Sequence, residues 1–387
     1  MKPRNSLIGG RMALVLLFTL PASNVSADIK MDFSGSSGYT SNLLSDSSRN
    51  EDSFSSTKVS LRAYPHSTTE ISFNNDYTYY SKFYNLSSFN GGFGLRFIPT
   101  GKKSPLSILF SLNFSARVYR DNFLKFNNDN YDALFSAGYN WQGILFRSGV
   151  SYNSMKYHNP AVPDSLRSDS LVVSDKNTFK LFAGTNFALL NSISIDFEGG
   201  YAYMDYTRFR DTIGYINPSR FKPVDSFMTG DRLESYYFSP RISGQLGAKV
   251  GLNVTYNYRK FANKKDKVVY GPGTGWISPW ALHYEGQSIT ASLKTYYLPH
   301  SIISSGIGYW DKTFFRSIDE LFVWLKDAHK RRDFQTRFYL SLQRPIPLKS
   351  GTIVEPFLQF DYSDNKSSYK LYDYSSLSVS AGLTIKM

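Results

Sequence analysis

The segment from Leu106 to Tyr119 carries an apolar residue at every second position, and most of the residues between them are polar. Successive side chains of a β-strand point to opposite faces, so the segment predicts a strand with one apolar and one polar face. It is also long. Strands of soluble proteins average about 5–6 residues, whereas a strand that crosses a bilayer needs about 9–11. The pattern therefore favours a sheet that separates hydrocarbon from water.

The same pattern recurs along the chain and predicts about sixteen strands, an even number as in single-chain bacterial barrels. Long and short connections alternate between them, which is typical of extracellular loops and periplasmic turns. Because every backbone polar group in hydrocarbon must be paired, such a sheet must close on itself. We therefore expect an all-β fold, a transmembrane antiparallel up-and-down β-barrel with both termini in the periplasm. The expected strands are Ile29–Thr40, Thr57–Tyr64, Thr69–Tyr80, Phe89–Ile98, Leu106–Tyr119, Tyr131–Trp141, Ile144–Met155, Phe179–Leu189, Ser192–Tyr206, Glu234–Ser243, Ala248–Phe261, Ser288–Leu298, Ser301–Lys312, Phe334–Arg344, Ile353–Ser363 and Ser375–Met387.

Composition narrows the classes of function. Aromatic residues make up 17% of the chain, which suits strands and the aromatic girdles of membrane barrels. The chain has no cysteine, so it has no disulfide, thiolate metal site or cysteine nucleophile. The net charge is +13, but the basic residues are scattered among polar positions, which argues against a nucleic-acid partner. We expect no cofactor and no metal.

Residues 1–27 have the features of a secretory signal peptide. A basic stretch with Lys2, Arg4 and Arg11 precedes a short apolar core, and small residues lead to Ala27 and Asp28. An uncleaved membrane anchor is the alternative, but the apolar core is short for that role. We expect cleavage between Ala27 and Asp28, export in a Gram-negative-type cell, and a single barrel domain over residues 28–387.

The inward-facing positions decide what such a barrel does. A barrel of eight strands fills its own interior, whereas one of about 16–18 strands leaves an aqueous channel. So many charged residues could not occupy a dry core, but a water-filled lumen accommodates them. The expected lumen-facing residues are Lys58, Arg62, Arg96, Arg117, Arg147, Lys180, Arg241, Lys249, Arg259, Lys294, Arg337, Asp196 and Glu198.

The C-terminal segment from Ser380 to Met387 has a polar residue, then a glycine two positions later, then alternating hydrophobic residues. This segment resembles the assembly signal of Gram-negative outer-membrane β-barrels, with Gly382, Ile385 and Met387 in the signal positions. Met387 departs from the Phe or Trp that usually ends such proteins. In its overall pattern the chain resembles the sixteen-stranded porins most closely. The resemblance implies an outer-membrane location, contact with lipid and lipopolysaccharide, and insertion by the barrel assembly machinery, but no particular substrate.

The loops offer few candidates for chemistry. His158, near Asp164 and Ser165, could be read as the start of a catalytic site, but a solvated loop histidine explains it better. No metal-ligand spacing or nucleophile elbow is present.

Three loop segments have distinctive sequences. Ser317–Arg332 predicts a capped amphipathic helix that either folds into the lumen or packs over the rim. Gly271–Tyr284, with Trp276 and Trp280, could fold inward, although packing at the rim explains it better. A basic cluster could bind lipopolysaccharide phosphates or be solvated. Its members are Arg259, Lys260, Lys264, Lys265 and Lys267.

Two functions remain. The first is a channel for passive diffusion of small hydrophilic solutes, with a mild anion preference from the basic lumen. The second is a barrel without a channel, which would export or assemble a surface polymer or lipoprotein, or anchor a surface complex. The long loops favour the second, and the lack of a segment for a periplasmic domain lowers it. We do not expect an enzyme, and the sequence leaves the oligomeric state open.

Overall fold

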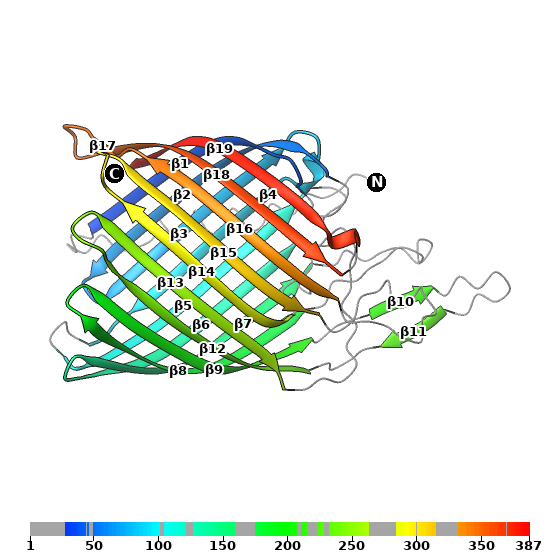
Figure 1. The fold of residues 1–387 in the computed structure, drawn as a ribbon, viewed down its shortest axis with the longest axis horizontal. Helices are drawn as coiled ribbons and strands as arrows, with labels where there is room; N and C mark the ends of the chain where they lie inside the picture. The colour runs from blue at the N-terminus through cyan, green and yellow to red at the C-terminus, as the bar shows by residue number, and fades with distance from the viewer. Residues whose placement is uncertain are drawn as a thin grey trace.

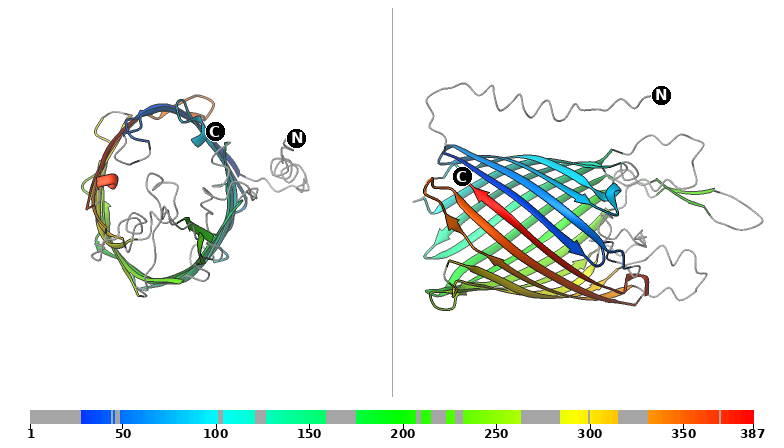
Figure 2. Two further views of the ribbon diagram at one scale, coloured as in Figure 1. Left: turned by 90° about the vertical axis from the view of Figure 1, so that its right-hand side faces the viewer. Right: turned by 90° about the horizontal axis from the view of Figure 1, so that it is seen from above.

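A computed structural model describes residues 28–387, apart from positions 44, 46–48, 101–103, 121–126, 159–174, 207–209, 215–222, 228–231, 263–283, 299, 315–330 and 369. Sixteen long antiparallel strands form one closed sheet in this part of the chain (Figure 1). Each of these sixteen strands pairs with the next one along the chain, and the last pairs with the first. Viewed along its axis, the wall is a closed ring of strands (Figure 2). The predicted closed antiparallel barrel of about sixteen strands is therefore confirmed.

The barrel strands are β1 (Asp28–Thr40), β2 (Asp52–His66), β3 (Thr69–Tyr80), β4 (Ser88–Phe97), β5 (Leu106–Tyr119), β6 (Asn128–Trp141), β7 (Ile144–Tyr157), β8 (Lys176–Leu190), β9 (Ile193–Tyr206), β12 (Arg232–Gln245), β13 (Val250–Phe261), β14 (Glu285–Thr295), β15 (Ile302–Thr313), β16 (Arg332–Gln343), β18 (Ile353–Ser367) and β19 (Tyr374–Lys386). A two-residue strand, β17 (Ile346–Pro347), extends the turn before β18. Two short 3₁₀ helices lie in connections at the end of the barrel that carries the long loops: η1 (Tyr84–Leu86) between β3 and β4, and η5 (Lys370–Tyr372) between β18 and β19. No helix among the described residues is long and apolar enough to cross a membrane.

The first and last strands close the barrel. β1 pairs with β19 from Asp32 opposite Lys386 to Thr40 opposite Ser378. The backbone of Met31 then exchanges hydrogen bonds of 2.9 and 2.8 Å with the backbone of Met387. Because this pairing continues to the last residue, the sheet has no free edge at the point where the two ends of the described chain meet.

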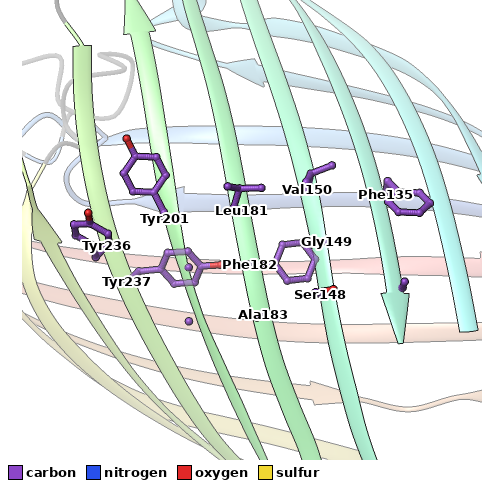
Figure 3. A pocket seen from close by; sticks show the side chains of 13 residues that line it. Phe135, Ser148, Gly149, Val150, Leu181, Phe182, Ala183, Tyr201, Tyr236 and Tyr237 are labelled. Carbon is purple, nitrogen blue, oxygen red and sulfur yellow. The ribbon is translucent and has the colours of Figure 1, made fainter. Parts of the chain in front are cut away.

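The outer face of the barrel is apolar. Large hydrophobic side chains lie exposed along almost every strand, and only a few, such as Met204, Leu233 and Phe261, are buried together. One cross-strand row of large residues runs over β6, β7, β8, β9 and β12 (Figure 3). Its members are Phe135, Val150, Leu181, Tyr201 and Tyr236. The hydrophobic side chains of this protein thus cover a surface instead of filling a core, as in a sheet whose apolar face meets lipid.

Beside that row, the adjacent outward row consists of small residues and leaves a shallow groove on the apolar face. Its members are Ala137, Ser148, Ala183 and Gly199.

Three local predictions need correction. The strand expected from Ala248 begins at Val250, so Lys249 lies in the preceding turn, with its ammonium 5.7 Å from the ring of Tyr297. The expected helix does not extend to Arg332, which is the first residue of β16, and residues 315–330 lie outside the described part. The loop after β9 also contains a separate hairpin, β10 (Arg210–Gly214) and β11 (Pro223–Phe227), which the sequence did not predict.

Closure can be tested with two neighbouring glycines. A Cβ added at Gly382 would collide with the backbone carbonyl of Gly35 and lie 2.6 Å from Cζ of Phe357, whereas a Cβ at Gly35 would meet nothing within 4 Å. We expect Gly382→Ala to lower the free energy of unfolding by about 1–3 kcal/mol through overpacking. The matched control, Gly35→Ala, should change it by less than about 0.5 kcal/mol. Urea unfolding of the refolded barrel measures both, and equal effects would contradict the assigned register.

Candidate functional site: the polar face of the barrel wall

The inner face of the wall is polar because strand alternation sends the other half of the side chains inward. Cross-strand neighbours share a face, and the registers connect Arg147, Glu198 and Ser239 in one row. Followed around the barrel in this way, all the predicted lumen residues except Lys249 occupy the polar face. These residues therefore share one face of the sheet, and their contact with a water-filled lumen stays a prediction.

A network of charged residues lies on the polar face of β7, β8 and β9, next to Tyr237 of β12. The guanidinium of Arg147 donates to Oδ1 of Asp196 at 2.8 Å and to Oε2 of Glu198 at 3.0 Å. Lys180 donates to Oε1 of Glu198 at 3.3 Å, and the hydroxyl of Tyr237 donates to the same oxygen at 3.1 Å. The side chains of Arg147, Asp196 and Glu198 are only 30%, 14% and 24% exposed. The charges in this network compensate each other at short range.

Most other bases on this face also have an acidic neighbour. Ion pairs join Arg62 to Asp32 at 2.7 Å and Lys386 to Glu355 at 2.6 Å. Both ends of the Arg337 guanidinium contact Asp361, with Nε at 3.0 Å from Oδ1.

Three further bases face an acid directly across the ladder. Lys58 lies opposite Asp76, Arg96 opposite Glu70, and Arg241 opposite Asp196. The positive charge expected of the lumen is therefore largely balanced by carboxylates within the wall.

On the polar face of the described strands, two exposed bases have no acidic neighbour, neither in an ion pair nor across the ladder. Arg117 lies between Asn90 and Asn128 in the ladders on its two sides. Lys294 lies between Gly251 and Ser304, and its ammonium is 5.5 Å from the ring of Tyr296. These two side chains carry an uncompensated positive charge on the polar face.

Further bases gather toward the long-loop end. Arg259 and Lys312 lie on either side of Gly286, and their cationic groups are 5.8 and 5.3 Å from the ring of Tyr284. Lys312 also donates to Oε1 of Gln335 at 2.6 Å. Lys312 ends the strand expected over Ser301–Lys312 and is not among the expected lumen residues, although it is an even number of positions from Ser304 and therefore shares its face.

Carboxylates fix the loops at the long-loop rim. Asp52 is buried and accepts hydrogen bonds from Oγ of Ser81 at 2.6 Å and from the backbone N–H groups of Lys82 and Phe83 at 2.9 and 2.8 Å. In the adjacent loop, hydrogen bonds from Lys82 and from the hydroxyl of Tyr39 lower the pKa of Glu51. The buried carboxylate of Asp333 likewise binds Arg331 and Ser367. These rim contacts hold the described loop ends against the strands.

The loop candidates do not form a second site among the described residues. His158 pairs with Asp129 of β6, with 2.8 Å between Nε2 and Oδ2, while Asp164 and Ser165 lie outside the described residues. No cluster of three or more His, Asp or Glu residues in the described ranges could hold a metal ion.

Other predicted features lie wholly or partly outside the described ranges. Ala27 precedes them and Asp28 is the first residue of β1. Of the basic loop cluster, Arg259 and Lys260 belong to β13. The rest of that cluster and both loop tryptophans fall in the undescribed segment 263–283; they are Lys264, Lys265, Lys267, Trp276 and Trp280.

Comparison with known proteins supports the fold. No protein-family model matches the chain, and neither does any curated protein. CdiB from Acinetobacter baumannii superimposes with a TM-score of 0.50 and 10% identity, over 92% of this chain and 60% of CdiB. The chain is also similar to a loop-deletion mutant of OmpT, an outer-membrane protein of Vibrio cholerae (TM-score 0.44, 10% identity, 94% of this chain and 99% of that one). OccK2 of Pseudomonas aeruginosa superimposes with a TM-score of 0.42 and 8% identity, over 94% of this chain and 98% of OccK2.

The described strands form a closed sixteen-stranded antiparallel β-barrel, and the superposition on CdiB is a likeness in fold. At these identities the likeness concerns the fold alone.

The charged network makes a prediction about stability. Arg147→Met would leave Asp196 and Glu198 close together, with only Lys180 and the neighbouring Arg241 to compensate them. We expect the free energy of unfolding to fall by about 1–3 kcal/mol, because partly buried charged groups lose their partner. Urea unfolding of the refolded barrel measures this change.

The control is Lys294→Met, which removes a base that has no ion pair among the described residues; its effect should stay within about 0.5 kcal/mol. Adding Asp196→Asn and Glu198→Gln should restore part of the stability lost in Arg147→Met. No recovery would show that the arginine acts through packing instead of charge.

Proposed function

We propose that this chain is an outer-membrane channel for passive diffusion of small hydrophilic solutes, with a mild anion preference. The observation that carries the proposal is the polar, charged inner face of a closed barrel of sixteen strands. Barrels of this width leave an aqueous channel unless a loop or a helix plugs them, and a polar, charged wall suits a water-filled lumen. No reaction is assigned to the wall, because most of its charged groups are paired with one another.

We extend the proposal to the export, membrane insertion and orientation of this channel. We propose cleavage after Ala27, a single barrel over residues 28–387, and insertion by the barrel assembly machinery through the segment that contains Gly382, Ile385 and Met387. The short turns and both termini would then lie in the periplasm, with the long loops facing the lipopolysaccharide-bearing side. The alternation of loop lengths supports this orientation.

The anion preference rests on few residues. Since most lumen bases face a carboxylate, a net positive potential comes mainly from bases without one, such as Arg117 and Lys294. An exposed charge in water acts on an ion about 10 Å away with about 0.4 kcal/mol. The preference is therefore expected to be small.

The test is single-channel conductance of refolded residues 28–387 in a planar bilayer. Stable open steps support the channel. A barrel that is folded, as judged by heat-modifiable gel mobility, but carries no current would overturn it and favour a barrel that exports a surface polymer or anchors a surface complex.

Selectivity provides a sharper prediction. Arg117→Glu should lower the chloride-to-potassium permeability ratio about two- to four-fold, because it reverses one exposed charge on the wall. The zero-current potential in a KCl gradient measures this ratio. The matched control, Lys349→Glu, makes the same charge change in the turn before β18 and should leave the ratio unchanged. An unaltered ratio in both variants would remove Arg117 from the conduction path.

A further inference from the structure

A second kind of surface lies on the inner wall, where the first and last strands of the barrel pair. Strands β16, β18, β19, β1, β2 and β3 line a recess of about 590 Å³ there. This volume falls in the range of roughly 300–1,000 Å³ found for small-molecule sites. The recess is formed from the polar face, since Ser36 lies opposite both Ser56 and Gly382, and Ser380 lies opposite Gln359.

Hydroxyl and amide groups dominate the lining. Serine occurs on β1, β2, β18 and β19, and glutamine on β16 and β18. Within the described part of the chain, four of these side chains make no hydrogen bond, although each can both donate and accept; they are Ser36, Gln359, Ser378 and Ser380. A ligand that carries many hydroxyl groups, each donor and acceptor at once, matches this set.

Among the described residues of the lining, only Arg337 and Asp361 are charged, and they form an ion pair with each other. The described lining of the recess therefore carries no net charge. The Arg337 side chain is 53% exposed, so its remaining N–H groups stay available while the carboxylate holds the guanidinium in place. A planar donor and a planar acceptor side by side suit adjacent hydroxyls of a neutral solute better than a free anion.

Two aromatic rings provide apolar surface beside these groups. Phe54 lies against Gly38 and Phe357 against Gly382, with Cζ atoms 2.7 and 2.6 Å from where a Cβ would stand. The glycines thus let each ring lie close to the backbone of β1 and β19. The ring of Tyr80 is 6.3 Å from that of Phe54 and extends this apolar surface. Aromatic faces beside convergent polar groups favour a ligand with both apolar and hydroxyl-bearing sides.

The loop after β1 fixes the border of the recess that lies nearest the long loops. The backbone N–H of Ser41 donates to the carbonyl of Leu377 at 2.8 Å, and the N–H of Leu377 donates to Oγ of Ser41 at 2.9 Å. Oγ of Ser376 donates to the carbonyl of Asn42 at 3.1 Å, and Asn42 is buried. The described lining is therefore preformed, which reduces the entropy lost on binding.

We propose that this recess binds a neutral carbohydrate of one or two rings. The inference deepens the proposed channel function, on which it rests for the route of the ligand, by naming a class of solute that the wall recognises. Hydroxyl and amide groups bind the sugar hydroxyls, Arg337 and Asp361 bind an adjacent pair of them, and Phe54 and Phe357 contact the C–H faces.

The test measures binding separately from conduction. Isothermal titration calorimetry uses residues 28–387 refolded in a detergent without a sugar head group, with maltose as the neutral probe and gluconate as the charged one. We expect saturable maltose binding, and gluconate at least ten-fold weaker. The variant Gln359→Leu/Ser378→Ala should weaken maltose binding at least ten-fold, because it removes two free hydrogen-bonding groups.

The matched control is Gln245→Leu, the same substitution at the end of β12, outside the recess. It should leave maltose binding unchanged, and heat-modifiable gel mobility checks that each variant folds. Equal binding by the double variant and the control, or preferred binding of gluconate, would overturn the carbohydrate site. Maltose binding without conductance would contradict only the channel, and conductance without maltose binding would contradict only the recess.

Discussion

The requirement that every backbone N–H and C=O be paired governs this structure. In hydrocarbon an unpaired peptide group costs several kcal/mol, so a spanning sheet is stable only when its first and last strands meet. Here β1 pairs with β19 along most of its length, and the backbone bonds between Met31 and Met387 complete the pairing at the final residue. Because the backbone ladder supplies this closure, the wall does not need a packed apolar core.

Closure in turn divides the side chains between two environments. The outer face accepts large apolar groups that would be unfavourable on a soluble protein, such as Phe93 and Tyr139. The inner face accepts charges, but it places most of them beside a charge of opposite sign. Arg147 with Glu198, and Arg62 with Asp32, illustrate how partly exposed ions on the wall reduce the cost of their desolvation.

Charge compensation gives the inner wall two chemically different regions. Around β7, β8 and β9 the wall is a network of ions, while around β18, β19, β1 and β2 it is rich in hydroxyl groups. Glycines allow both regions to form. Gly184 leaves space for the side chain of Arg147, and Gly382 leaves space for the ring of Phe357. The position of glycine on the polar face therefore contributes to the chemistry of the wall as well as to strand curvature.

The sequence by itself determined the fold class, the number of barrel strands and which residues of a strand share a face. These depend on a period of two and on loop lengths, which are local properties. The strand boundaries were placed less accurately, as Lys249 shows, because a turn residue can continue the alternation by chance. Only the tertiary structure decided which charges meet. Asp32 and Arg62, or the serines of β1 and β19, become neighbours through register and closure. Register is set by contacts between strands, and a single strand's alternation carries no information about its partner.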